Sequence, residues 1–164
     1  MTWSGVRKRL EEDLLAECLR GRIQYFCTSY SKYFDHNGRV AVRFDGREIF
    51  KSDYPDFYAG CDMHDTRLRK SFPKSAKRWK LVYNAALHDG HFDQQCFYKA
   101  YREFNDHSII ENLNSENAII RMLAILDRRV GKRQLLKLVG KIDEEPEWLR
   151  QFYIIRFEGE GIPL

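Results

Sequence analysis

Two short segments of the chain carry cysteine and histidine at a spacing that suits zinc. Two residues separate Cys61 from His64, and two residues separate His88 from His91. Thiolate sulfur and imidazole nitrogen are common zinc ligands, and a bound zinc ion can activate water for hydrolysis. However, the chain has no paired CxxC motif, and the aspartates around these positions suit turns and helix caps equally well. The pattern therefore predicts either two polar loops, which we favour, or the metal site of a hydrolase.

Two longer stretches contain cations and no carboxylate, and they are the best functional clue in the sequence. In the first stretch, Phe72, Trp79 and Tyr83 are interleaved with the cations. Such runs can follow a phosphate backbone, and aromatic rings between them can stack on bases. The alternative, which we favour for these runs, is a pair of solvated helix faces with Trp79 and Tyr83 in the core. The candidate contact residues are Lys74, Lys77, Arg78 and Lys80 in the first stretch and Arg128, Arg129, Lys132, Arg133 and Lys137 in the second.

The second stretch, within residues 126–141, could present a helix start to an anion. We expect Gly131 to end one helix, so that Lys132 and Arg133 begin the next. Backbone N–H groups and the helix dipole at such a start attract negative charge. If the protein binds an anionic partner, we expect this segment to contribute contacts. The alternative is internal pairing of these cations with the carboxylates at positions 143, 144, 145 and 147.

The sequence contains no recognisable catalytic motif. A GxSxG nucleophile elbow, a Walker phosphate loop and a GxGxxG dinucleotide motif are all missing. Any of the four cysteines could meet one of the five histidines in the folded chain, but a single sequence does not reveal such a pair. We therefore expect a non-catalytic binding protein with no cofactor, whose partner is nucleic acid or an acidic protein surface.

The composition is that of an ordinary globular protein. Hydrophobic residues make up 43% of the 164 positions and charged residues 32%, which excludes a disordered chain. The longest apolar runs are far shorter than the roughly 18–20 residues that span a bilayer, and no secretory signal begins the chain. Four irregularly spaced cysteines predict reduced thiols. We expect a cytoplasmic protein without a membrane segment.

The first third of the chain predicts a helix followed by an antiparallel meander. Ser4 can cap a helix that Gly21 ends. Residues 22–51 then alternate apolar and polar positions, with turns at 35–38 and at 45–46. A two-residue turn at 45–46 would place Val42 opposite Ile49 and Ala41 opposite Phe50.

The remainder of the chain predicts helices. Residues 52–74 read as an irregular connection, and residues 75–158 as a helical part with starts at Ser75, Asp93, Ser108, Ser115 and Pro146. The predicted fold is therefore a single α+β domain over 1–164, with the helix and meander in 1–51.

Several local motifs resemble those of a known family. They are the Trp3–Ser4 start, the Asp45–Gly46 hairpin and, above all, the Leu-Asp-Arg-Arg-Val-Gly-Lys-Arg run at 126–133. Together they resemble a family of uncharacterised bacterial proteins over most of the chain. The resemblance implies a small bacterial cytosolic protein and carries no activity, substrate or catalytic residue with it.

Overall fold

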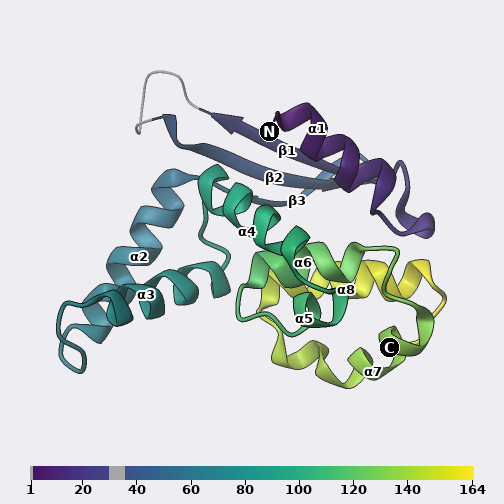
Figure 1. Cartoon of the computed structure of the whole chain (residues 1–164). Coiled ribbons are helices and arrows are strands. Elements are labelled where there is room, and N and C mark those ends of the chain that lie inside the picture. Colours follow the sequence, from purple (N-terminus) through teal and green to yellow (C-terminus); the bar gives the residue numbers. More distant parts are fainter. Residues whose placement is uncertain (1, 30–35) are drawn as a thin grey trace.

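The computed structural model describes residues 2–29 and 36–164 and has the expected α+β architecture (Figure 1). The sheet order is β1-β2-β3, all antiparallel, with β1 (Ile23–Ser29), β2 (Gly38–Phe44) and β3 (Arg47–Ser52). The turn expected at 35–38 lies partly outside the described residues. The α-helices are α1 (Trp3–Lys8), α2 (Tyr54–Leu68), α3 (Ala76–His88), α4 (Gln94–Asp106), α5 (Ile109–Leu113), α6 (Ala118–Leu126), α7 (Lys132–Leu138) and α8 (Glu147–Gly159).

The N-terminal helix is shorter than the sequence predicts. Thr2, rather than Ser4, caps α1, because its hydroxyl accepts a hydrogen bond from the Gly5 N–H. After a π-helical turn at Arg9–Asp13, the helix ends, and the Arg128 N–H donates to the Leu14 carbonyl at 2.7 Å. The expected continuation to Gly21 is therefore wrong, because the backbone after residue 13 pairs with a distant segment instead.

The predicted hairpin is confirmed at its turn. Asp45 and Gly46 both have positive φ, at 48° and 78°, as a type I′ turn requires. Arg43 lies opposite Glu48, as expected. The turn chemistry of the two loop residues therefore fixes the first pairs of the ladder.

The hairpin register changes beyond these first pairs. A bulge places Val42 opposite Phe50, where the sequence predicted Ile49, and Ala41 opposite Lys51. The extra residue turns the Phe50 ring into the core, where it stacks on Phe92 with ring centroids 5.0 Å apart. The observed register therefore differs from the predicted one because it buries the Phe50 ring, which is larger than the Ile49 side chain.

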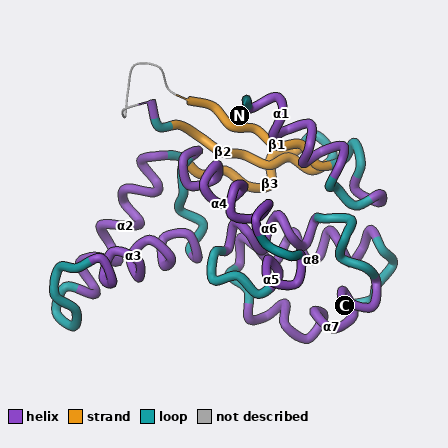
Figure 2. The backbone as a smooth tube through the Cα atoms, in the orientation of Figure 1, coloured by secondary structure: helices purple, strands orange, loops and turns teal. Residues whose placement is uncertain are grey.

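Residues 54–68 form a helix, so the irregular connection predicted for 52–74 is wrong over most of its length. Asp53 and Asp56 form a reciprocal capping box, and Pro55 occupies the first turn of α2. In Figure 2, α2 leads away from the sheet and α3 leads back toward the other helices. We call residues 53–89 the α2–α3 hairpin.

The later helices begin close to the predicted positions. Ser75 and Asp93 cap α3 and α4, and Ser108 forms a capping box with Glu111 at α5. The next start is displaced, because Asn117 rather than Ser115 caps α6. Local capping chemistry therefore predicts most helix starts.

The core lies between the sheet and α4, α6 and α8. Helix α4 packs on β1 and β2, and α6 packs on both α4 and α8. Eight of the nine residues of α6 are buried, so this helix is the centre of the core. None of the helices in 2–29 and 36–164 is both long and apolar enough to cross a membrane. Fully buried aromatic side chains fill the space: Tyr25, Phe92, Phe97, Phe104, Phe152, Tyr153 and Phe157.

Candidate functional site

The end of the α2–α3 hairpin is a surface of one sign of charge. We define the hairpin tip as residues 66–80, which contain seven cations and no carboxylate. Four of these cations are exposed and have no hydrogen bond or ion pair within the described part of the chain. They are Arg67, Lys70, Lys74 and Lys77.

Arg78 holds the tip together instead of facing solvent. Its Nε lies 2.9 Å from a carboxylate oxygen of Asp65, and its Nη1 donates to the Phe72 carbonyl at 3.1 Å. Only 11% of the side-chain surface is exposed. Ser75 caps α3 at the same place by accepting from the Arg78 N–H. Of the predicted contact residues in this stretch, Arg78 therefore serves the fold, while Lys74 and Lys77 remain free.

Trp79 is exposed, and its assignment to the core is wrong. The indole is 54% exposed, whereas Val82 and Ala86 of the same helix are buried. Helix α2 covers the face of α3 that carries Val82 and Ala86. Trp79, one turn closer to the tip, borders Asp65 of α2 but keeps more than half of its surface in solvent. Tyr58 on α2 is also exposed, at 66%. Tyr58 lies outside residues 66–80, so the tip itself combines free cations with the exposed ring of Trp79.

A recess of ≈ 600 Å³ lies beside Trp79. Tyr83 forms part of its wall, with its ring edge-on to Phe57 at 6.0 Å between centroids. The Lys99 ammonium lies 4.8 Å from the centroid of the Tyr83 ring, close enough for a cation–π contact. Burial, together with the nearby Cys96 thiol, raises the pKa of Tyr83, so the phenol stays protonated. The remaining lining residues are Lys80, Asn84, Glu103, Ser115, Glu116 and Asn117.

The second predicted cluster lies around the start of α7. Gly131 precedes α7, as expected. Arg129 is not free, because its guanidinium bonds the buried carboxylate of Asp127 at 2.8 Å. Lys132 donates to the Glu160 carbonyl at 3.4 Å. Three cations of the cluster are exposed without a described partner, namely Arg128, Arg133 and Lys137.

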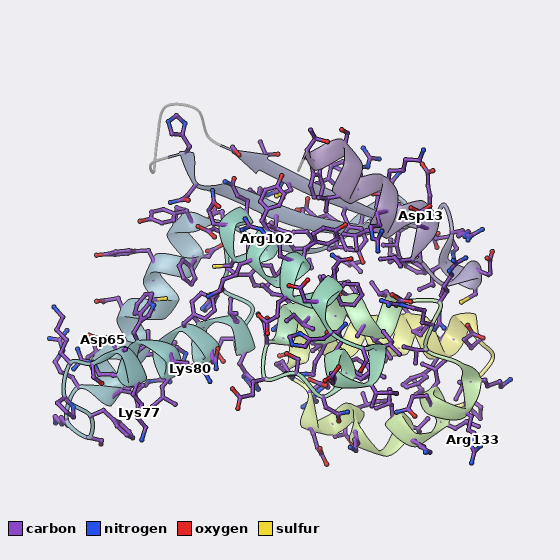
Figure 3. All side chains as sticks on the ribbon, viewed as in Figure 1. Asp13, Asp65, Lys77, Lys80, Arg102 and Arg133 are labelled. Atoms are coloured by element: carbon purple, nitrogen blue, oxygen red, sulfur yellow. The ribbon has the colours of Figure 1, made fainter. Side chains whose placement is uncertain are left out.

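The downstream carboxylates do not pair with this cluster within the described residues. Glu145 instead binds Arg121, whose Nη2 donates to it at 2.8 Å. Six cations and five carboxylates nevertheless share residues 127–147, whereas residues 66–88 hold seven cations and no carboxylate. Figure 3 shows Lys77 and Lys80 at one end of the molecule and Arg133 at the opposite end. The two clusters are therefore separate surfaces, and the hairpin tip has the greater excess of positive charge.

The cysteine and histidine segments hold the hairpin in place. His64 lies 2.7 Å from one oxygen of Asp89, and His88 lies 3.4 Å from the other. Burial, with a contribution from Asp93, raises the pKa of Cys61 to about 11, so its thiol stays protonated at neutral pH. In the part of the chain that the structure describes, no group of three or more His, Cys, Asp or Glu side chains is arranged to hold a metal ion.

The sequence did not reveal the recess. Lys99 belongs to the polar side of α4. Asn117 was overlooked because the sequence placed the start of α6 at Ser115. Neither residue forms a motif with Trp79, because the three come from separate elements. Only the packing of α3 against α4 and α6 brings them together.

The comparisons with known proteins identify a family and nothing closer. No curated protein and no solved structure matches the chain. Residues 2–157 match the model of the SF0329 protein family. This matched range includes both the hairpin and the cluster near α7. The match confirms the resemblance to an uncharacterised family. The chain therefore belongs to the SF0329 protein family.

Proposed function

We propose that the protein binds nucleic acid without catalysis, through the tip of the α2–α3 hairpin. The observation that carries this proposal is the seven cations and no carboxylate of residues 66–80, at the end of a hairpin that also exposes Trp79. Lysine and arginine on one surface neutralise phosphates and release condensed counterions. An exposed indole adds a face on which a base can stack.

The exposed indole favours nucleic acid over an acidic protein surface. Either partner would be attracted by Lys70, Lys74 and Lys77, but every nucleotide brings a planar base that can stack on Trp79, whereas Asp and Glu side chains bring none. The cluster near α7 remains a second predicted contact through Arg133. We do not propose metal-assisted hydrolysis, because no three His, Cys, Asp or Glu side chains of the described residues are grouped to hold a metal ion.

We place this activity in the bacterial cytoplasm as part of the proposal. The support is that all four cysteines are free thiols. Unpaired cysteines are the normal state in a reducing compartment.

Fluorescence anisotropy with labelled random-sequence oligonucleotides tests the proposed function. We expect the logarithm of the affinity to fall linearly with the logarithm of salt concentration, with a slope of about −3 to −4 if the four free cations of the tip each neutralise a phosphate. Unlabelled oligonucleotide should displace the probe, whereas polyglutamate should not. Absence of binding, or binding that salt leaves unchanged, would overturn the proposal. Equal displacement by polyglutamate would assign the surface to an acidic protein.

A further inference from the structure

We infer that the recess beside Trp79 receives an unpaired nucleobase, so that the protein recognises single-stranded segments rather than duplex. This inference rests on the proposed function and adds the form of the nucleic acid. The recess, at ≈ 600 Å³, has the size of a small-molecule site. It is also continuous with the hairpin tip, because Trp79 and Lys80 belong to both.

The aromatic walls of the recess suit a planar ring. Trp79 exposes its indole at the mouth, and Tyr83 and Phe57 line the interior. A base in a duplex has both faces covered by its neighbours, so it reaches such walls only when it is unpaired and unstacked. Stacking on aromatic side chains is tolerant of base identity, which fits a site without a sequence motif.

Cations at the mouth suit the phosphate of the same nucleotide. Lys99 is exposed and is held over the Tyr83 ring at 4.8 Å. Lys80 lies 3.7 Å from Glu116, and both side chains are more than 70% exposed, so this ion pair is weak and easily exchanged for a phosphate. Lys77 lies one turn before Lys80 on α3, closer to the tip (Figure 3).

Polar groups within the recess can read the edge of a base. Asn84 donates to Glu116 at 3.4 Å, a long contact between exposed side chains. The side-chain amide oxygen Oδ1 of Asn117 already accepts from the Ile119 N–H, which leaves the side-chain NH₂ group as a donor for a ligand. Amide and carboxylate groups together supply the donors and acceptors that a base edge requires.

The first arm of the test compares two single strands of equal charge with a duplex. A single-stranded 12-mer, a 12-mer carrying abasic sites throughout its centre and a 12-bp duplex are bound to the protein at one salt concentration. We expect the intact single strand to bind at least about 5-fold more tightly than the abasic strand, because abasic sites keep the phosphates and remove the stacking bases. The duplex carries about twice as many phosphates, but it should still bind more weakly than the intact single strand, because its bases are covered by their stacked neighbours.

The second arm compares three variants whose folding is checked by thermal unfolding. Trp79→Ala and Lys99→Ala should each weaken binding of the intact strand, by roughly 5- to 100-fold for Trp79→Ala, and leave duplex binding nearly unchanged. Tyr58→Ala is the matched control, because Tyr58 is exposed on the same hairpin but does not line this recess. It should change neither affinity.

The outcomes separate this inference from the proposed function. Equal, salt-dependent binding of all three nucleic acids, unaffected by Trp79→Ala, would overturn the recess assignment and leave the proposed function standing. An equal loss of single-strand and duplex binding in Trp79→Ala would show that the indole serves the general surface, which also overturns the inference. Absence of binding to all three would overturn both.

Discussion

The α2–α3 hairpin and the rest of the molecule use their side chains in opposite ways. The main core spans the sheet, α4, α6 and α8 and buries seven aromatic rings almost completely. The hairpin has a separate core in which only Cys61, Val82 and Ala86 are buried, with Phe57 and Leu68 packed at its margin. Its large aromatic side chains Tyr58 and Trp79 face solvent instead.

This difference indicates which part of the molecule stabilises the fold. Burial of large apolar side chains is the main source of folding free energy, so the sheet and central helices stabilise the chain. A hairpin that exposes Tyr58 and Trp79 and places cations together gains little stability from these residues. Such exposed features are typical of interaction surfaces. The comparison therefore assigns folding to the main core, and it supports the proposal that the hairpin tip contacts the partner.

The largest expected effect separates the two cores. Phe97→Ala, in the main core, should lower the free energy of unfolding by about 3–5 kcal/mol, because it removes a fully buried ring. Val82→Ala, in the hairpin core, should lower it by only about 1–2 kcal/mol, since two methyl groups are lost. Urea denaturation of the two variants measures both values. A larger loss for Val82→Ala would break the proposed division.

A smaller effect separates two cations of the hairpin. Arg78→Met should lower the free energy of unfolding by about 1–3 kcal/mol, because it leaves Asp65 and the Phe72 carbonyl without their shared partner. Lys77→Met is the matched control and should change it by less than about 0.5 kcal/mol. Thermal and urea unfolding of both variants provide the measurement. Equal destabilisation would mean that Lys77 also serves the fold.

The smallest effect concerns Asp89, the carboxylate at the end of the hairpin that contacts His64 and His88. Partial burial acts to raise the pKa of the Asp89 carboxyl group, but hydrogen bonds from His64 and His88 lower it, and the net result is a lowered pKa. A carboxyl whose pKa is lower in the folded state stabilises the fold above about pH 4, and this contribution is lost as the pH falls through the lowered pKa. Asp89→Asn should therefore melt below the wild type at neutral pH, with the difference closing in acid. A difference that stayed constant down to acid pH would contradict the role of this charge.

The sequence predicted those parts of the fold that local chemistry controls. Ser75, Asp93 and Ser108 cap helices with their own side chains, and the Asp45–Gly46 turn depends on two adjacent backbone conformations. The elements that failed depend on distant partners. The first helix ends where its backbone forms hydrogen bonds with residues 126–128. The bulge in β3 lets Phe50 pack on Phe92 in the core.

Helix α2 was missed for a different reason. The Asp53–Asp56 capping box and Pro55 mark its start in the sequence, but its apolar residues do not form a continuous stripe. A helix with so small a buried face gives a weak periodic signal.

The charges of the candidate site could be predicted, but their availability could not. Arg78 and Arg129 look like their neighbours in the sequence, yet each is held by a carboxylate, from Asp65 and Asp127 respectively. The exposure of Trp79 likewise depends on which face of α3 is covered by α2. Side-chain pairing and helix packing therefore decide which residues remain for a partner.

The central claim is that the hairpin tip, and not the cluster near α7, provides the main contact. Two matched triple variants test it, Lys70→Gln/Lys74→Gln/Lys77→Gln in the tip and Arg128→Gln/Arg133→Gln/Lys137→Gln near α7. Each removes three exposed cations that have no partner in the described residues, so the change in net charge is the same.

The measurement is the affinity for a labelled oligonucleotide over a range of salt concentrations. We predict that the tip variant loses at least about 10-fold in affinity near 0.1 M salt and that its log–log salt slope becomes shallower by about 2–3, while the α7 variant stays within about 3-fold of the wild type. An equal loss in both variants, or a loss confined to the α7 variant, would contradict the account.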